Sequence, residues 1–385
     1  MAELASNGMR IGLDARFFGP LETGIGRYVE RLVAHLAVID QRNEYVVFLR
    51  RRGYDWWQPP NSRWRKVLAD YHWYGLAEQR AMPGIFRRAR LDLLHVPHFN
   101  VPLLTRGPFV VTIHDLILDE FPTERATTLE PLLFALKFRA YQAVVRHAIR
   151  HSRAIMTVSE HSKRQLVERF RIPAGKVTVT YESVDPLPEA VPFESLAERG
   201  VRRPYLLHVG NTYPHKNLER LIAAVELTNR RRLDFQLVLV GKDDYFARRL
   251  RVEVQQRALR NVLFFGFASD QELAALYQHA QAYIFPSLSE GFGLPGLEAM
   301  QAGTPVFAAR ASCLPEVFAD AAAYFDPLEP TAIAQSIERA LRDTLLRQRL
   351  ITAGRRRLTY FSWRRLAEQT LALYEKSSGH GPVST

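Results

Sequence analysis

Short apolar runs alternate along the chain with longer segments in which apolar residues recur at helical spacing. In the first half, these runs lie at 9–15, 44–50, 92–98, 109–115, 154–160 and 176–182. Such runs are typical of strands that are buried on both faces of a parallel sheet. Between the first two runs, Tyr28, Leu32 and Leu36 fall on one face of a helix. The pattern therefore predicts an α/β domain with helices on both sides of its sheet.

The same alternation restarts after 184–204, a proline-rich stretch without periodicity that we expect to be a linker. In the second half, strands are expected at 205–211, 235–241, 261–267, 282–287, 304–310 and 322–327. Ser269, followed three residues later by Glu272, predicts a capping box at the start of one intervening helix. Because 385 residues are too many for one ordinary core, we predict two doubly wound Rossmann-like domains, which bind ligands at the carboxyl ends of their strands.

Composition narrows the class of protein. A hydrophobic content of 47% with 24% charged residues is that of a globular chain. The single Cys313 gives no disulfide framework, the opening residues lack a secretory pattern, and no apolar run approaches the roughly 20 residues that span a bilayer. The sequence thus predicts a cytoplasmic protein, or one bound to the inner face of a membrane without crossing it.

The formal charge of +12 calls for an anionic partner, unless the chain is simply rich in arginine. Nucleic acid, acidic lipid and a phosphorylated substrate are the three candidates. No recognition motif or aromatic-basic platform favours nucleic acid, so we expect no nucleic-acid partner.

The strongest chemical signal is the stretch PSLSEGFGLPGLEAMQAGTPV, residues 286–306. A strand is expected to end in it, and Pro295 suits the first turn of a following helix. Amides around Gly293, Leu294 and Gly296 would then point unpaired at a ligand. Because the helix dipole also places positive charge there, the stretch predicts an anion site that suits phosphate.

Two glutamates flank this predicted phosphate position. Glu290 precedes the helix and Glu298 lies in its first turn. An ionised carboxylate accepts hydrogen bonds and cannot donate them, so each glutamate fits a pair of sugar hydroxyls. One ribose, one second sugar and a diphosphate between them describe a nucleotide-sugar. The alternative is a capped helix with two incidental glutamates.

The stretch resembles the signature of the family 4 glycosyltransferases, which are retaining enzymes of the GT-B fold. The resemblance extends to GLDARFFGPLETGIGRY (12–28), TIHDL (112–116), TVSEHSK (157–163), HVGNTYPHKNLERLIAA (208–224) and ASCLPEVFADAA (311–322). The chain is most similar to mannosyltransferase-like members that act in O-antigen and exopolysaccharide assembly. The resemblance implies two domains that face each other across a cleft: an acceptor-binding domain at 1–190 and a nucleotide-sugar-binding domain at 204–360. A helix at about 362–376 would cross back to the first.

The resemblance implies catalytic roles for three residues. Glu290 should touch hydroxyls of the transferred sugar, Lys216 should neutralise the departing diphosphate, and His114 should face the reacting sugar. A solvated lysine at a helix start and a satisfied core histidine are the alternatives for Lys216 and His114.

Further residues are implied in binding the donor: Gly24, Gly26, Asn211, Phe267, Phe292, Gly293, Leu294 and Glu298. Glu298 should contact the ribose, and Phe267 lies in a loop that should flank the base. Gly24 and Gly26 should form a loop that closes over the phosphates, although plain turn glycines have the same pattern. Asn211 stands where many relatives carry an arginine, which leaves the source of a second positive charge open.

The implied reaction is electrostatic and retaining, with the departing phosphate oxygen taking the proton of the acceptor. Neither a metal nor a cofactor is expected, because amides and Lys216 would hold the diphosphate. The resemblance favours GDP-mannose as the donor, ahead of UDP-sugars and dTDP-rhamnose, and a glycan or lipid-linked glycan as the acceptor. A nucleotide-sugar epimerase of the same fold is the alternative.

One segment bears on location. The run 137–153 places Arg139, Arg146, Arg150 and Arg153 on one helical face and apolar residues on another. Basic amphipathic helices lie on anionic membranes, so peripheral, salt-sensitive membrane binding is one interpretation. A helix that packs its apolar face on a sheet and turns its arginines to water has the same pattern.

Overall fold

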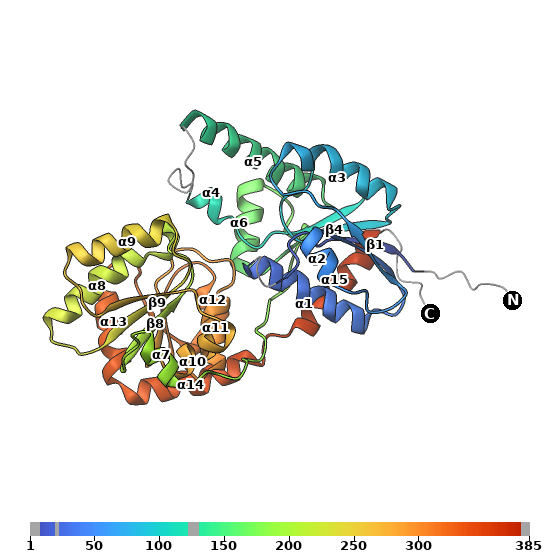
Figure 1. Cartoon of the computed structure of the whole chain (residues 1–385). Coiled ribbons are helices and arrows are strands. Elements are labelled where there is room, and N and C mark those ends of the chain that lie inside the picture. Colours follow the sequence, from blue (N-terminus) through green and yellow to red (C-terminus); the bar gives the residue numbers. More distant parts are fainter. Residues whose placement is uncertain (1–7, 20–22, 122–130, 379–385) are drawn as a thin grey trace. The chain divides into compact units, whose positions relative to one another are not determined.

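A computed structural model describes residues 8–19, 23–121 and 131–378. These residues divide into two compact units, the first of which comprises 8–19, 23–116, 131–182 and 363–378, and the second 117–121 and 183–362. In each unit, helices cover a sheet of parallel strands (Figure 1). The predicted fold class of two doubly wound Rossmann-like domains is therefore confirmed.

The first unit contains a seven-stranded sheet in the order β3-β2-β1-β4-β5-β6-β7. Its strands are β1 (Arg10–Asp14), β2 (Glu44–Leu49), β3 (Trp64–Leu68), β4 (Leu93–Val96), β5 (Phe109–Thr112), β6 (Ala154–Thr157) and β7 (Val177–Val179). All six strands expected in this half are present, but the edge strand β3 was not predicted. Its sequence WRKVL has only Trp64 fully buried, where the indole stacks at 4.0 Å on Tyr45 of β2.

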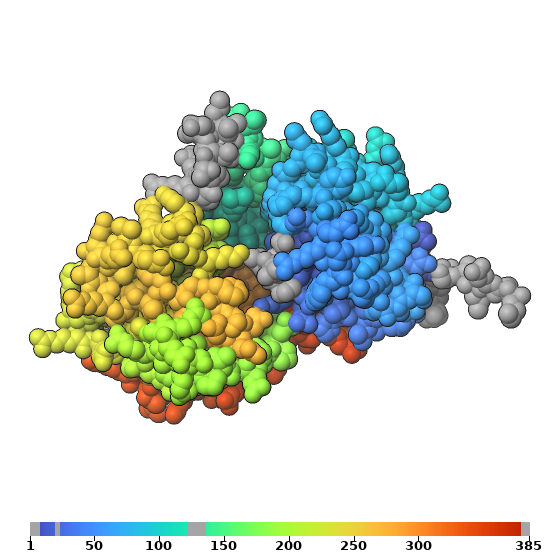
Figure 2. Space-filling view, in the orientation of Figure 1, coloured from blue at the N-terminus to red at the C-terminus, as the bar shows by residue number. Residues whose placement is uncertain are grey.

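Helices of the first unit lie in two layers (Figure 1). They are α1 (Thr23–Ile39), α2 (Arg51–Trp56), α3 (Leu76–Arg88), α5 (Pro131–His151), α6 (Glu160–Phe170) and α15 (Trp363–Ser378), with a 3-10 turn, η3 (Ala174–Lys176). One core layer joins α1 and α15 to the sheet, and the other joins α3, α5 and α6 to its opposite face. The segment from α2 to α3, in the lighter blues, forms much of the surface of this unit that Figure 2 shows.

Buried polar groups tie α15 to the sheet. The hydroxyl of Tyr374 lies 2.6 Å from Nδ1 of His95, whose Nε2 lies 2.8 Å from Oγ1 of Thr112. The hydroxyl of Thr112 in turn lies 3.0 Å from the hydroxyl of Tyr28 on α1. Burial, and then the charge of His114, lowers the pKa of His95 to about 3, so its ring is neutral. The path satisfies polar groups that would otherwise be costly to bury.

The apolar face of the predicted 137–153 helix is committed to this core. Val145, Ala148 and Ile149 of α5 are fully buried against the sheet, whereas Arg139 and Arg146 are exposed. The second interpretation, a helix that packs apolar residues on the sheet and turns arginines to water, describes this part of α5. Peripheral membrane binding stays a prediction, for which the exposed arginines of α5 are available.

The second unit has a six-stranded sheet in the order β10-β9-β8-β11-β12-β13. Its strands are β8 (Tyr205–Val209), β9 (Gln236–Val240), β10 (Val262–Gly266), β11 (Ala282–Phe285), β12 (Val306–Ala309) and β13 (Ala322–Phe325). Each agrees with an expected strand. Because the order reverses between β8 and β11, the carboxyl ends of these two strands flank the switch point where such sheets bind ligands.

Helices of the second unit are mostly amphipathic. They are α4 (Ile117–Glu120), α7 (Phe193–Glu198), α8 (Leu218–Arg230), α9 (Tyr245–Gln256), α10 (Asp270–His279), α11 (Leu294–Gln301), α12 (Leu314–Phe318), α13 (Pro330–Arg342) and α14 (Thr344–Leu358), with 3-10 turns η4 (Pro214–Lys216) and η5 (Ala319–Ala321). The predicted capping box of Ser269 and Glu272 is confirmed at the start of α10.

The stretch 184–204 is more ordered than the predicted linker. It contains α7, whose Leu196 is fully buried and which packs against α10. Across the described residues, no helix has the length and apolar character needed to cross a membrane.

Candidate active site

The candidate site of the second unit lies at the carboxyl ends of β8 and β11. Gly210 follows β8 with a φ of +150°, and its carbonyl oxygen lies only 2.1 Å from where a Cβ on Gly241 would stand. Glycine is therefore needed where the loops after β8 and β9 meet. The loop after β8 also joins the loop after β11, because His215 O accepts the N–H of Leu288 at 2.7 Å.

Helix α11 begins as predicted, and its start is shaped by glycines. Gly293 is the N-cap, with a φ of +106° that favours glycine, and Pro295 lies in the first turn. A Cβ on Gly296 would lie 2.3 Å from a ring atom of Phe318. These glycines therefore bring the helix start close to the core of the unit.

The expectation of three unpaired amides at this helix start is partly wrong. Gly296 N–H donates to Gly293 O at 3.0 Å, because the first turn closes tightly. The N–H groups of Gly293 and Leu294 have no hydrogen-bond partner among the described residues. The start of α11 thus offers two unpaired amides at the positive end of the helix dipole, which is enough to contact an anion.

Lys216 and Glu290 form the central contact of the site. Lys216 Nζ, at the end of η4, donates to Glu290 Oε1 at 2.7 Å, with side chains only 13% and 9% exposed. Burial alone would raise the pKa of the Glu290 carboxyl, but the charge and hydrogen bond of Lys216 hold it below its usual range. Burial, followed by the charge of Lys216, lowers the pKa of the adjacent His215 to about 4. The pair is therefore a salt bridge beside a neutral imidazole.

Several side chains that the sequence did not single out hold the Glu290 loop in place. The thiol of Cys313 lies 3.2 Å from Glu290 O and 3.3 Å from Phe292 O, and Ser312 Oγ accepts the N–H of Glu290. The buried amide of Asn217 donates to Pro286 O at 3.0 Å. Only tertiary structure brings these groups together, so no local sequence signal could have found them.

The remaining residues predicted in this unit lie around the same edge of the sheet. Tyr277 donates to Glu298 Oε2 at 3.1 Å. Phe292 is buried, whereas Phe267, after β10, is 73% exposed. Asn211 is partly exposed, and its Oδ1 accepts the N–H of Tyr213 at 3.5 Å.

The other predicted residues belong to the first unit. His114 follows β5, and its Nδ1 and Nε2 each lie 3.2 Å from an acceptor, Glu182 Oε1 and Pro97 O respectively. Each ring nitrogen therefore has an oxygen within reach that can accept an N–H. Burial alone would lower the pKa of His114, but the hydrogen bond and charge of Glu182 raise it above its ordinary value. The pairing with Glu182 thus favours the protonated form of the ring.

Gly24 and Gly26 were expected in a loop and are not. Both lie in the first turn of α1, which begins at Thr23. Gly24 is exposed, and no atom lies within 4 Å of where its Cβ would stand, whereas Gly26 is buried. The residues that precede α1, from 20 to 22, lie outside the described chain.

The site of the second unit combines two amides at the start of α11, one lysine and two carboxylates. This set can bind a diphosphate and accept hydrogen bonds from hydroxyls. The described residues contain no group of three or more His, Cys, Asp or Glu side chains arranged to hold a metal ion.

Comparisons with known proteins agree with this geometry. Residues 23–186 match the family model described as Glycosyltransferase Family 4, and residues 197–357 match the model described as Glycosyl transferases group 1. The chain is 29% identical over 388 residues to O-antigen chain mannosyltransferase B of Escherichia coli, covering 92% of this chain and 96% of that protein. It is also 29% identical over 330 residues to the MMP alpha-(1->4)-mannosyltransferase of Mycolicibacterium hassiacum, covering 82% and 77% respectively.

Among solved structures, sucrose-phosphate synthase from Thermosynechococcus elongatus superimposes with a TM-score of 0.75 at 21% identity. The match covers 97% of this chain and 100% of that one. At this identity, the likeness concerns the fold alone.

Proposed function

Because the chain belongs to the family 4 glycosyltransferases, we propose that it moves a mannosyl residue from GDP-mannose to a glycan acceptor. Two relatives of similar length are named as mannosyltransferases, one of them for the O-antigen chain. Their names support a part in cell-surface polysaccharide synthesis and give no support to the epimerase alternative.

The observation that carries this proposal is the Lys216–Glu290 pair beside the start of α11. When the donor binds, Lys216 would turn to the diphosphate, whose other oxygens meet the amides of Gly293 and Leu294. Glu290 would then be released to accept hydrogen bonds from the mannosyl hydroxyls. Lys216 would thus exchange Glu290 for phosphate, and Glu290 would exchange Lys216 for hydroxyls. Such an exchange suits a ligand that carries both groups.

Further roles follow from position in the second unit, which we assign to the donor. Glu298 would accept hydrogen bonds from the ribose, while Tyr277 fixes its orientation. The exposed ring of Phe267 would stack on the base. Asn211 and Phe292 would line the diphosphate and sugar positions. The first unit would bind the acceptor, with His114 facing the reacting sugar and Gly24 and Gly26 at the phosphate end of α1.

The proposed chemistry retains the anomeric configuration. The bond between the anomeric carbon and the diphosphate breaks, and the acceptor hydroxyl attacks from the same face. The departing phosphate oxygen takes the hydroxyl proton, so no protein base is required. Lys216 and the helix amides stabilise the negative charge that develops on the diphosphate. We propose that the reaction needs neither a metal nor an organic cofactor, because these groups carry the charge.

Ligand-induced stabilisation tests the donor. Melting temperatures with GDP, UDP, dTDP and ADP should rank GDP first, because a ligand that binds only the folded chain raises its melting temperature. Transfer from GDP-mannose to a mannose-terminated acceptor should then be detectable and should stay within about twofold in excess EDTA, because fixed N–H groups replace a metal. A larger shift with another nucleotide, or loss of transfer on chelation with recovery in manganese, would contradict the proposal.

The acceptor and the location are linked proposals. We propose a glycan or lipid-linked glycan acceptor and a cytoplasmic chain that binds peripherally to the inner face of the membrane. The arginine face of α5 supports this location, as does a second basic surface beside α3. There, a cavity of about 500 Å³ has Arg80, Arg87, Arg90 and Arg106 among its lining residues and no acidic residue.

A further inference from the structure

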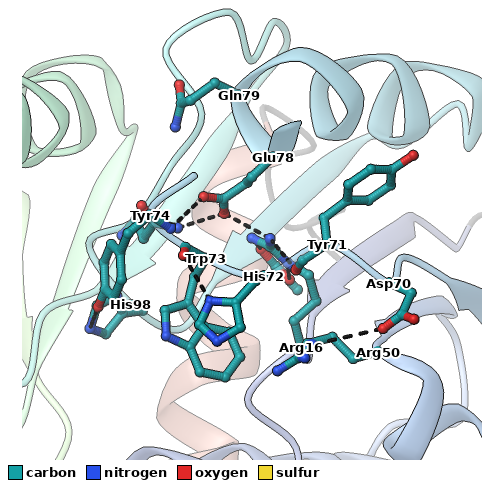
Figure 3. Close-up of polar contacts among 12 residues, drawn as sticks. Arg16, Arg50, Asp70, Tyr71, His72, Trp73, Tyr74, Glu78, Gln79 and His98 are labelled. Carbon is teal, nitrogen blue, oxygen red and sulfur yellow. Dashed lines mark hydrogen bonds and ion pairs between the residues drawn. The ribbon is translucent and has the colours of Figure 1, made fainter. Parts of the chain in front are cut away.

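Three charges are buried together at the switch point of the first unit, where the strand order reverses between β1 and β4 (Figure 3). Arg16 follows β1 and donates from Nε and Nη2 to the two oxygens of Asp14, at 2.7 Å each. Its Nη1 lies 2.7 Å from Oε1 of Glu78, on α3. The side chains of all three are at most 3% exposed. Buried ion groups of this kind add little net stability, so their usual value is to fix a conformation.

What this ion group fixes is the aromatic loop Tyr71–Tyr74, between β3 and α3. Glu78 Oε2 accepts the N–H of Tyr74 at 2.8 Å, and Arg16 Nη1 reaches Tyr71 O at 3.4 Å. Tyr74 has a φ of +66°, in the left-handed region that a bulky residue rarely adopts. The residue as a whole is nevertheless 58% exposed, although burial and the charge of Glu78 raise the pKa of its hydroxyl. The fold therefore holds a strained backbone in place and presents a large aromatic ring to solvent, a combination that marks functional sites.

The hydroxyl of Tyr74 is oriented by a buried histidine. His98 Nδ1 accepts the N–H of Asn100 at 3.3 Å, so the proton of the neutral ring is on Nε2. Burial, then the charges of His114 and Arg16, lowers the pKa of His98 to about 3, which keeps this ring neutral. Its Nε2–H faces the oxygen of Tyr74 at 3.4 Å. With its oxygen as the acceptor, the phenol O–H of Tyr74 remains a donor that a ligand could use.

The neighbouring aromatic residue packs the loop against the rest of the first unit. Trp73 stacks on the buried Phe17, with ring centroids 4.1 Å apart, and the guanidinium of Arg50 lies 5.0 Å from the Trp73 centroid. Figure 3 shows Trp73 and His72 side by side beneath the ion group. An exposed tyrosine on a loop held by these contacts, with a hydroxyl that can donate, matches a pyranose, which offers an apolar face and a rim of hydroxyl acceptors.

We propose that Tyr74 is the residue on which the first unit holds a hexopyranose ring of the glycan acceptor. The proposal rests on the proposed function for the presence of such an acceptor. Tyr74 packs against the apolar face of the ring and donates to one of its hydroxyls. Asp14, Arg16 and Glu78 are positioning residues that act through the loop backbone.

Replacement of Tyr74 by glycine separates binding from folding. Glycine adopts a φ of +66° without strain, so Tyr74→Gly should melt no lower than the parent chain. Without the ring, the KM for the acceptor should rise at least tenfold, while the melting-temperature shift with GDP and donor hydrolysis without acceptor stay within twofold. Tyr74→Phe, which loses only the donor, should raise KM by an intermediate factor. Tyr360→Ala, which removes a tyrosine that is 56% exposed elsewhere, is the matched control.

Saturation-transfer NMR with mannotriose decides the proposal without relying on transfer activity. The parent chain and Tyr360→Ala should transfer saturation to the sugar, and Tyr74→Gly should lose at least four fifths of that signal. If GDP fails to bind the parent chain but the NMR difference remains, the donor proposal fails and this one stands. Undiminished signal from Tyr74→Gly, or no signal from the parent chain, would overturn the assignment of Tyr74.

Discussion

Lys216 and Glu290 neutralise each other in the chain without ligand. The effect of replacing either residue therefore depends on what the ligand offers to the partner that remains. Both are largely buried, so removal of one partner leaves the other poorly compensated. A diphosphate could compensate Lys216, whereas nothing on a bare nucleotide would compensate Glu290. The two residues should therefore differ in their effects on nucleotide binding.

We expect Glu290→Gln to bind GDP at least as tightly as the parent chain while transfer falls by about 100-fold or more, because the sugar loses an ionised acceptor.

Lys216→Met and Glu298→Ala should each weaken GDP binding by about 1–3 kcal/mol through loss of a hydrogen bond to the ligand. Calorimetric titration and initial rates measure both effects. Glu338→Ala, which removes a carboxylate on α13 of the second unit, outside the site, is the control and should bind GDP like the parent chain. Equal GDP affinity and full turnover in Glu290→Gln and Glu298→Ala would contradict these roles.

The paired state of His114 makes the stability of the first unit depend on pH. Its pKa is raised in the folded chain, so its contribution is complete below the ordinary histidine value of about 6.5. The contribution is lost as the pH rises through the folded value, because the neutral ring interacts less with Glu182. The difference in melting temperature between the parent chain and His114→Gln should therefore be larger at pH 5.5 than at pH 9.5.

Gln142→Ala serves as the control for this measurement, because Gln142 lies on α5 of the same unit and has no titrating group. Its difference from the parent chain should not vary with pH by more than experimental error. A pH-independent difference for His114→Gln would show that the ring is not held as a cation.

At the scale of single elements, the start of α11 depends on having no side chain at Gly296. A Cβ there would enter the ring of Phe318, so Gly296→Ala should destabilise the second unit by about 1–3 kcal/mol despite the better helix propensity of alanine. For a unit of this size, that corresponds to a fall in melting temperature of roughly 3–10 °C. Differential scanning calorimetry should resolve this change.

The double variant Gly296→Ala with Phe318→Leu should recover part of the loss, because it removes the clashing ring atoms. Gly84→Ala in α3 is the control, since the nearest atom to its Cβ is the flexible end of Arg88 at 3.5 Å. That variant should be neutral or stabilising by up to about 1 kcal/mol. A stable Gly296→Ala would mean that the helix start can shift away from Phe318.

Elements with a strong apolar period could be predicted from the sequence, and those that depend on a neighbour could not. Twelve strands were predicted because each is an apolar run in the sequence. The edge strand β3 was missed because Arg65 and Lys66 interrupt its pattern, while its burial comes from Tyr45 on the adjacent strand. Helix α7 was missed for a similar reason: six residues are too short for a period, and its Leu196 is buried by tertiary packing.

The candidate site divides in the same way. The start of α11 was predicted from glycine and proline chemistry that is local to the sequence. The pairing of Lys216 with Glu290, and the support of their loops by Cys313 and Asn217, joins residues up to 74 positions apart in the chain. The aromatic loop at Tyr74 was not predicted. The carboxylate of Glu78 holds its backbone, and only the folded chain brings Glu78 into a buried ion pair with Arg16.

At the scale of the whole molecule, the chain carries a formal charge of +12, and part of this charge gathers in two groups of arginines. Arg139, Arg146 and Arg150 are exposed on α5, and the cavity beside α3 on the same side of the sheet is lined by four further arginines. Leu104, on the rim of that cavity, is 70% exposed. Since Val145, Ala148 and Ile149 of α5 are buried, we expect the membrane attraction through 137–151 to come mainly from its arginines.

We therefore expect the chain to pellet with vesicles containing anionic lipid at low salt and to be released as salt rises, because screening shortens the range of the attraction. Each arginine near the surface contributes about 1 kcal/mol, so replacing Arg139, Arg146 and Arg150 by glutamine should weaken binding by up to roughly 100-fold. The matched control replaces the exposed Arg248, Arg249 and Arg260 of the second unit, which removes the same charge elsewhere. Equal loss in both triple variants would assign the attraction to bulk charge, and equal, negligible pelleting with anionic and neutral vesicles would refute membrane binding. A selective loss in the α5 variant is the result that a local basic surface requires, because only position distinguishes the two sets.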